Sequence, residues 1–336
     1  MVYSMTCHPR LGGALSEGGG HGIHPSRNSG EETMITNPNV KINLGLNVLR
    51  KREDGFHDLE TLFVPYFGIH DTLEIVVGDD YSRTSAALFA KYGSQVPASQ
   101  GYVKPEGVFG VETLDSDAPK IVQGISEDGK LMITIAREEG VDWDPLTDLC
   151  ARAYFILSED FQLPAVKIFL EKTSPVGAGL GGGSADAAFA LKMLNDLCGL
   201  NLTESQLADY ASRLGSDCAF FVYNRPMIGE GRGEKLSEYP ISLDDYDLQV
   251  ITPAGIAVST KDAYAGIGPH LPEVPLREAL SKPIEEWDGI LVNDFENTVF
   301  AKYPELEAIK RSLYDSGAVY ASMSGSGSAL FAFYRK

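Results

Sequence analysis

The stretch SPVGAGLGGGSADAAFALKMLNDLCGL, from Ser174 to Leu200, gives the strongest indication of how this chain folds. It concentrates glycines at positions 177, 179, 181, 182 and 183 and then turns at once into an apolar pattern of helical spacing, with Ala187, Leu191, Leu194 and Cys198 on one face. Ser184 is expected to be the N-cap, with Asp186 in the first turn and Gly199 just beyond the last turn.

Consecutive glycines before a helix let a ligand approach the backbone, and the helix N-terminus offers unpaired N–H donors to an anion. Gly177 to Gly182 fits G-x-G-x-x-G, but a dinucleotide site needs an acidic residue after a following strand, about 20 positions on. A second helix follows here instead, with a capping box at Thr203 and Gln206, an apolar stripe and a stop at Gly215. A Walker A site is also excluded, because no Lys-Ser or Lys-Thr follows the glycines. The alternative is a turn that merely packs a helix on a sheet, but so many glycines destabilise such a turn more than that role requires. We therefore predict a phosphate-binding loop.

Composition narrows the classes of partner. The net charge is −19, from 28 Lys and Arg against 47 Asp and Glu, which disfavours nucleic acid and anionic membranes as partners. No apolar run is long enough to span a bilayer, and no secretory signal pattern opens the chain. Cys7, Cys150, Cys198 and Cys218 form no C-x-x-C pair, so neither a zinc site nor a redox pair is predicted. We expect a cytoplasmic enzyme with a small-molecule substrate, as a monomer or weak homodimer.

The length favours two domains. We expect a disordered leader over 1–33, a first domain over 34–245 and a second over 246–336. From Val40 a long hairpin is predicted, followed by strands over 71–77, 130–136 and 165–172 and a helix over 148–161. The segment 78–129 is weakly patterned and is treated as an insertion of unknown conformation. The second domain is expected to begin with a strand at LQVITPAG and to contain helices at PLREAL and PELEAIKRSLYDSG.

PVGAGLGGGSADAA resembles the phosphate loop of the GHMP small-molecule kinases. VKINLGLNVLRKREDGFHDLETLF (Val40 to Phe63), LGSDCAFF (Leu214 to Phe221) and SMSGSGSALFA (Ser322 to Ala332) resemble three further motifs, in order, of the branch that phosphorylates 4-diphosphocytidyl-2-C-methyl-D-erythritol in the methylerythritol phosphate route to isoprenoids. The K-I-N and G-F-H pattern is specific to that branch, whereas the loop alone indicates only the family. The resemblance implies an α+β, two-domain GHMP kinase fold: a ribosomal protein S5 domain 2-like N-terminal domain and a ferredoxin-like C-terminal domain.

The resemblance also implies roles for individual residues. Lys41 and Asp217 would be the catalytic pair, with Asp217 directed at the substrate hydroxyl; taken alone, they would be an edge lysine and a helix cap. ATP, with Mg²⁺, would bind the loop residues Pro175, Val176, Gly177, Ala178, Gly179, Leu180, Gly181, Gly182, Gly183, Ser184 and Ala185. Asn43 would lie at the substrate hydroxyl, Phe56 and His57 would stack on and hydrogen-bond the cytosine, and Tyr264 would form a second aromatic wall. Ser324 and Gly325 would donate to the diphosphate. No dedicated metal ligands are predicted.

Three departures from the family pattern affect these expectations. Asp148 stands where the family usually has Asn near the adenine, and the segment 78–129 is longer than usual. Relatives are also expected to continue beyond Lys336 through a further helix and strand, so the second domain is expected to be truncated, with an open sheet edge. The alternatives are another GHMP kinase, of the homoserine or mevalonate type, and a catalytically idle nucleotide-binding protein.

Overall fold

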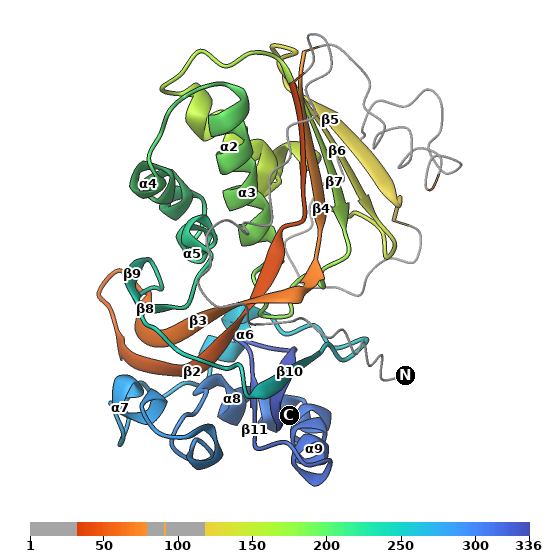
Figure 1. Ribbon diagram of the computed structural model, residues 1–336. Coiled ribbons are helices and arrows are strands. Elements are labelled where there is room, and N and C mark those ends of the chain that lie inside the picture. Colours follow the sequence, from red (N-terminus) through yellow and green to blue (C-terminus); the bar gives the residue numbers. More distant parts are fainter. Residues whose placement is uncertain (1–31, 79–90, 92–117) are drawn as a thin grey trace.

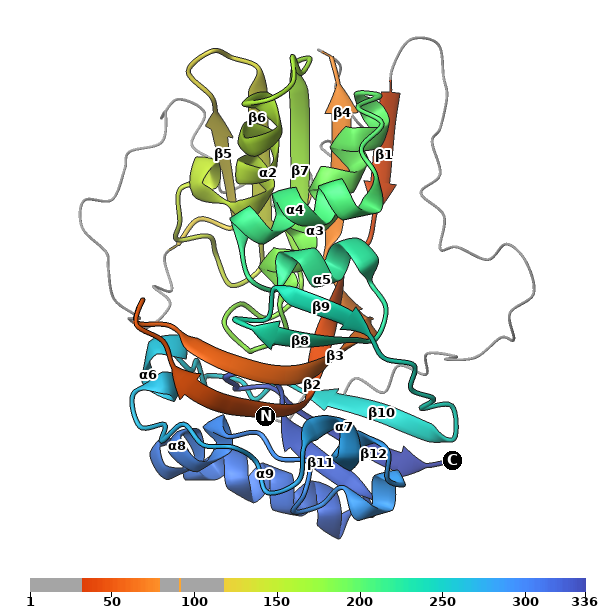
Figure 2. The ribbon, with the colours of Figure 1, turned by 90° about the vertical axis from the view of Figure 1, so that its left-hand side faces the viewer.

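The computed structural model describes residues 32–78, 91 and 118–336. Two domains lie one above the other, with a long, curved hairpin between them (Figure 1). The same order of layers appears after a quarter turn, where the hairpin separates the upper sheet and helices from the lower domain (Figure 2).

A five-stranded sheet forms one layer of the first domain, in the order β1-β4-β7-β6-β5. Its strands are β1 (Glu32–Thr36), β4 (Thr72–Val77), β5 (Ile121–Ile125), β6 (Leu131–Arg137) and β7 (Val166–Lys172). The pair β6 and β7 is parallel and the others are antiparallel. The parallel pair needs a crossover connection, which a 3₁₀ turn (Pro145–Thr147) and the helix α2 (Leu149–Ser158) supply.

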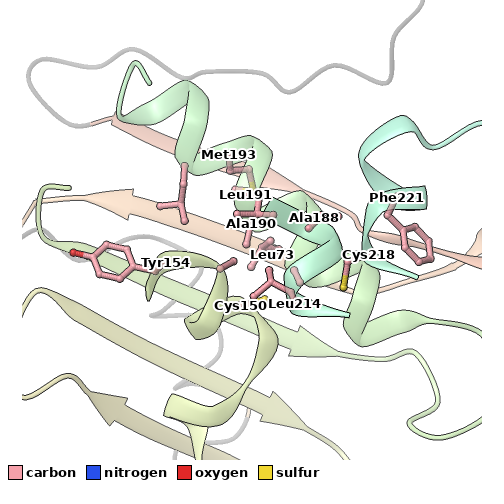
Figure 3. Close-up of a cluster of buried hydrophobic side chains, with 14 of the residues drawn as sticks. Leu73, Cys150, Tyr154, Ala188, Ala190, Leu191, Met193, Leu214, Cys218 and Phe221 are labelled. Atoms are coloured by element: carbon pink, nitrogen blue, oxygen red, sulfur yellow. The ribbon is translucent and has the colours of Figure 1, made fainter. Parts of the chain in front are cut away.

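Four helices cover one face of this sheet (Figures 1 and 2). They are α2, α3 (Gly182–Leu197), α4 (Glu204–Leu214) and α5 (Cys218–Tyr223). In the core between the layers, Ala188, Ala190 and Leu191 of α3 lie close to Cys150 of α2 and Leu73 of β4 (Figure 3). The small alanines let α3 approach its neighbours closely, and this fixes the position of the glycine-rich loop that precedes it.

The hairpin belongs to a second sheet, in the order β2-β3-β8-β9. Its strands are β2 (Asn39–Lys51), β3 (His57–His70), β8 (Met227–Gly231) and β9 (Lys235–Glu238). Residues 39–48 of β2 are all buried, so both of its faces are covered. Val40 and Ile42 share one apolar cluster with Phe331 and Phe333 of the second domain. The hairpin is therefore common to both domains.

The second domain has a three-stranded antiparallel sheet in the order β10-β12-β11. Its strands are β10 (Tyr246–Ile251), β11 (Tyr320–Met323) and β12 (Leu330–Arg335). Its helices are α6 (Thr260–Tyr264), α7 (Leu276–Leu280), α8 (Phe295–Lys302) and α9 (Pro304–Asp315), with a 3₁₀ turn at Ile284–Glu286. Leu306 and Leu313 of α9 pack with Ala321 and Ala332 of the sheet.

Most predicted elements are present. The hairpin, the capping box at Thr203 and Gln206 and the helix stop at Gly215 are confirmed. The second domain's first strand is present but starts at Tyr246, two residues before the predicted LQVITPAG. No helix of residues 32–78, 91 and 118–336 is long and apolar enough to cross a membrane.

Two further boundaries differ from the prediction. β1 begins at Glu32, before the expected start at Met34, because residues 32–36 pair with β4. The segment 78–129 is not wholly irregular, since Ile121–Ile125 forms the edge strand β5 on β6. This strand contains glycine and glutamine and pairs on one side only, so its sequence signal is weak. The rest of the expected leader and most of the expected insertion lie outside the described residues.

Candidate active site

The loop between β7 and α3 has a backbone suited to an anion. Gly177, Gly179 and Gly181 have φ of +73°, +76° and +74°, a left-handed conformation that other residues rarely adopt. The helix begins directly after Gly181, and no side chain in the described part of the protein caps its first turn. Its first N–H groups therefore remain for a ligand, at the positive end of the helix dipole. The predicted N-cap at Ser184 is wrong, because the left-handed Gly181 starts the helix earlier and leaves Ser184 inside it.

The two domains hold this loop between them. On the hairpin side, the backbone N–H of Lys41 donates to Leu180 O over 2.9 Å. On the other side, the backbone N–H of Ala329 donates to Ala178 O over 3.1 Å. The side chains of Ala178, Leu180 and Ala185 are buried, so these predicted nucleotide-binding residues can offer only their backbone to a ligand.

The remaining predicted loop residues differ in how far they are exposed to a ligand. Val176 is 50% exposed, and Gly177 and Gly183 are also exposed. Pro175, Gly179, Gly181 and Ser184 are half-buried, and Gly182 is buried. A Cβ on Gly182 would lie 2.3 Å from Ser174 Oγ, so only glycine fits where the end of the loop returns to its start.

Lys41 and Asp217 meet at the edge of the loop, although they come from distant segments. Lys41 Nζ lies 3.4 Å from Asp217 Oδ2, with side-chain exposures of 3% and 29%. The ammonium also donates to Asn43 Oδ1 over 2.6 Å and to Gly179 O over 2.9 Å. Asp217 occupies the N-cap position of α5, as the alternative interpretation expects, but its side chain makes no capping hydrogen bond within the described residues. Its carboxylate is therefore available to a substrate.

The surroundings of Lys41 bear on its protonation. Burial lowers the pKa of Lys41, and the negative charge of Asp217 opposes this shift. The ring of Phe63 adds a second attraction for the ammonium, with Nζ 5.5 Å from the ring centroid. The interpretation of Lys41 as a solvated edge lysine is therefore wrong.

Asn43 lies on the same face of β2 as Lys41, as predicted, and serves as its partner. The Asn43 amide donates to Thr61 Oγ1 over 3.1 Å, so its orientation is fixed and its oxygen faces the ammonium. Ser324 Oγ donates to Gly179 O over 3.1 Å and lies 3.4 Å from Asn43 Oδ1. A Cβ on Gly325 would meet Gly179 O at 2.9 Å. The loop after β11 thus contacts both the glycine-rich loop and the hairpin.

Of the predicted base-binding residues, Phe56 and His57 lie at the end of the hairpin and Tyr264 lies on α6. The rings of His57 and Tyr264 are stacked, with centroids 4.8 Å apart and planes at 18°. Phe56 is 53% exposed. Burial and the nearby Lys51 lower the pKa of His57, which favours the neutral imidazole. A neutral imidazole has one donor and one acceptor, the groups needed to bind a cytosine edge.

A buried group of charges behind the loop was not predicted. Lys172 Nζ lies 2.5 Å from Asp71 Oδ2 and 2.6 Å from Asp186 Oδ2. Asp71 also accepts the N–H groups of Thr173 and Ser174, each over 2.7 Å. The group therefore joins the end of β7, where the loop starts, to the first turns of α3, where the loop ends. The sequence does contain a signal for the burial of Lys172, because strand alternation places it on the same face of β7 as the buried Ile168 and Leu170.

The charges in this group are not balanced. Burial raises the pKa of Asp186 well above its ordinary value, against the pull of Lys172, and Asp186 Oδ1 has no hydrogen-bond partner among residues 32–78, 91 and 118–336. Burial alone would raise the pKa of Asp71, but the charge of Lys172 and the hydrogen bonds from Lys172 and Ser174 outweigh it, so the pKa is lowered. Two buried carboxylates thus share one ammonium.

Asp148, the departure noted near the expected adenine site, caps α2. Its Oδ1 accepts the N–H of Cys150 over 2.9 Å, and its Oδ2 accepts Trp143 Nε1 over 3.2 Å. Both carboxylate oxygens are thus engaged within the protein.

A cavity of about 950 Å³ lies elsewhere, at the outer end of the hairpin. Arg50, Arg52, Asp58 and Lys235 are among its lining residues, and Lys41 and Asp217 are not. The two arginines pair with Asp58 across the cavity wall. We assign the site to the Lys41–Asp217 pair, because it joins uncapped N–H groups, a cation and an accessible carboxylate.

Comparison with known proteins agrees with this geometry. The family description "GHMP kinases N terminal domain" matches residues 148–225, and "GHMP kinases C terminal" matches residues 276–336. A Bacteroides fragilis protein named 4-diphosphocytidyl-2-C-methyl-D-erythritol kinase is 41% identical over 301 residues, covering 90% of this chain and 92% of the relative. A Bacteroides thetaiotaomicron protein of the same name is 42% identical over the same shares of both chains.

The chain belongs to the 4-diphosphocytidyl-2-C-methyl-D-erythritol kinase family of GHMP kinases.

Solved structures support this assignment at the level of the fold. A crystal structure of 4-(cytidine 5'-diphospho)-2C-methyl-D-erythritol kinase is 27% identical, with a TM-score of 0.61 over 89% of each chain. The Methanococcus jannaschii mevalonate kinase matches with a TM-score of 0.52 at 12% identity, a likeness of fold alone. The predicted two-domain GHMP kinase fold is confirmed.

Proposed function

We propose that this kinase transfers the γ-phosphoryl group of ATP to the 2-hydroxyl of 4-diphosphocytidyl-2-C-methyl-D-erythritol, a step in the methylerythritol phosphate route to isoprenoids. The observation that carries the proposal is the 3.4 Å pair of Lys41 Nζ and Asp217 Oδ2 beside an uncapped helix N-terminus. The names of the relatives at 41% and 42% identity supply the substrate.

The phosphate loop would hold the nucleotide. Backbone N–H groups of residues 177–184 donate to the phosphate oxygens, and the α3 dipole favours their negative charge. Among residues 32–78, 91 and 118–336, no cluster of three His, Cys, Asp or Glu is placed to hold a metal ion. Mg²⁺ would therefore be held chiefly by the phosphates and water, as it commonly is, and would supply charge neutralisation.

The catalytic pair would act on the acceptor hydroxyl. Asp217 orients this hydroxyl and accepts its proton as the oxygen forms a bond to the γ-phosphorus and the bond to the ADP oxygen breaks. Lys41 favours the ionised form of Asp217 and stabilises charge on the transferring group. Asn43 and the Gly179 carbonyl hold the ammonium in place, at 2.6 and 2.9 Å.

The aromatic end of the hairpin would select the substrate. His57 hydrogen-bonds the cytosine edge, while Phe56 and Tyr264 offer ring faces for stacking. Gly325 lies next to Gly179 and would donate its backbone N–H to the diphosphate. The predicted donor role of Ser324 does not fit, because its N–H donates to Ala329 O and its Oγ donates to Gly179 O. We place the reaction in the cytoplasm, because Cys150 and Cys218 are buried thiols that form no disulfide within the described residues. We propose a monomer or weak homodimer.

An assay of ADP release tests the proposal. Purified protein is incubated with ATP, Mg²⁺ and, separately, the cytidine substrate, homoserine or mevalonate. We expect ADP release that depends on the cytidine substrate and a product that carries one additional phosphate. Turnover of homoserine or mevalonate alone would assign another GHMP kinase activity. No turnover with any of the three would favour an idle nucleotide-binding protein.

A further inference from the structure

Arg232 lies in the turn between β8 and β9, at residues 232–234, and this turn adjoins the catalytic carboxylate. A Cβ on the neighbouring Gly233 would lie 3.7 Å from Asp217 Oδ1 and 3.4 Å from the ring of Phe63. The turn is well defined, since the N–H of Gly233 donates to Glu230 O over 3.1 Å and the N–H of Arg232 donates to Glu234 Oε2 over 2.6 Å. An arginine on this turn is therefore held beside the reacting groups.

The side chain of Arg232 extends toward the aromatic end of the hairpin. Its Cζ lies over the ring of Phe56, 4.9 Å from the centroid. The next residue, His57, stacks on Tyr264. The turn thus spans the interval between Asp217, which adjoins Gly233, and Phe56, over which the guanidinium lies. A substrate that joins a base to an acceptor alcohol through a diphosphate would bring its phosphates to this interval.

The guanidinium is also available for a ligand. Arg232 is exposed, and no carboxylate within the described ranges forms an ion pair with it. Arg50 and Arg52, at the same end of the hairpin, are both paired with Asp58. In a chain of net charge −19, an uncompensated cation beside the catalytic carboxylate is a local attraction for an anion.

We propose that Arg232 binds the diphosphate of the nucleoside-diphosphate-linked substrate and so selects it over uncharged or monophosphorylated alcohols. This inference rests on the function proposed above. The planar fork of a guanidinium can donate two parallel hydrogen bonds to phosphate oxygens. Stacking on Phe56 already restricts the orientation of the guanidinium before the substrate binds, so less conformational entropy is lost on binding. Arg232 is a specificity-determining residue for the acceptor, separate from the backbone donors that receive ATP.

Calorimetric binding of CDP and of cytidine tests the proposal. The wild-type protein is expected to bind CDP more tightly than cytidine. Arg232→Gln should weaken CDP binding about tenfold to a hundredfold, the cost of one charge-assisted phosphate contact, while cytidine binding stays unchanged. Arg232→Lys, which keeps the charge but loses the fork, should fall between them. Arg213→Gln is the matched control, because Arg213 is also an exposed arginine over an aromatic ring, at 5.7 Å from the Tyr210 centroid, and lies on α4.

Steady-state kinetics gives a second measurement, and the unchanged binding of cytidine separates a phosphate contact from simple packing on Phe56. Arg232→Gln should raise KM for the cytidine substrate and leave KM for ATP unchanged. CDP binding equal to wild type, or a rise in KM for ATP alone, would overturn the assignment of Arg232 while leaving the kinase activity standing. A wild-type protein that neither binds CDP nor turns over the cytidine substrate would overturn the proposed function and this inference together.

Discussion

Substitution of Gly179 by alanine tests whether the contact between the domains sets the geometry of the phosphate loop. A Cβ at this position would lie 2.1 Å from Ser324 O and 3.0 Å from Gly327 N. Both obstacles are backbone atoms, so no flexible side chain can move aside. The Gly179 carbonyl also accepts from Lys41 Nζ and from Ser324 Oγ, at 2.9 and 3.1 Å. Any movement of residue 179 therefore disturbs Lys41, the proposed catalytic lysine, as well.

Two costs follow, and they can be separated. The φ of +76° costs an alanine about 1–2 kcal/mol of stability wherever it occurs. Relief of the clash requires a movement of roughly 1 Å, and a misplacement of that size can cost about 10²-fold in rate. Gly199→Ala is the matched control, because Gly199 has φ of +60° beyond the end of α3 and a Cβ there meets nothing within 4 Å.

Urea unfolding and ADP release measure the two costs. We expect both variants to lose about 1–2 kcal/mol from the left-handed backbone, with a larger loss for Gly179→Ala. Only Gly179→Ala should lose about 10²-fold in kcat/KM. If Gly179→Ala retains the activity of Gly199→Ala, the domain contact does not control the loop geometry, and the reasoning is refuted.

Three further predictions concern buried and titrating groups. Lys172→Met should lower the free energy of unfolding by about 3–5 kcal/mol, because it leaves Asp71 and Asp186 without their counter-ion. A decrease of less than about 1 kcal/mol in the free energy of unfolding, measured with urea, would contradict this prediction. His57→Ala should weaken CDP binding, and equal CDP affinity in the variant would argue against a role in base recognition. The CDP affinity of the wild type should not change between about pH 8 and about pH 7, because the lowered pKa of His57 keeps its ring neutral over that range. Burial raises the pKa of Cys218 to about 12, so iodoacetamide at about pH 8 should label this thiol only after unfolding, as followed by mass spectrometry; rapid labelling of the native protein would show that Cys218 is not enclosed.

Local signals in the sequence predicted much of the framework. Strand alternation placed Lys41 and Asn43 on one face, and their side chains meet at 2.6 Å. The capping box at Thr203 and Gln206 located α4. Glycine spacing indicated an anion-binding loop, although the start of α3 was misplaced at Ser184, because a left-handed glycine can replace a side-chain cap.

The remaining features depend on long-range contacts that no local pattern encodes. Lys172 joins Asp71 and Asp186 only because β4, β7 and α3 pack around one core. Arg232 reaches Phe56 only because β8 pairs with β3. The meeting of Lys41 and Asp217 likewise depends on the fold, and only the resemblance to the GHMP kinases predicted it.

Turnover by Asp217→Asn tests the central claim most directly, because this change keeps the size of the side chain and removes its charge. With the cytidine substrate and ATP, we predict that kcat falls by about 10²–10⁴, the usual contribution of a general base, while the affinities for ATP and CDP stay near those of wild type. A variant that binds both ligands and still turns over at the wild-type rate would contradict the assignment of Asp217 as the group that receives the hydroxyl proton.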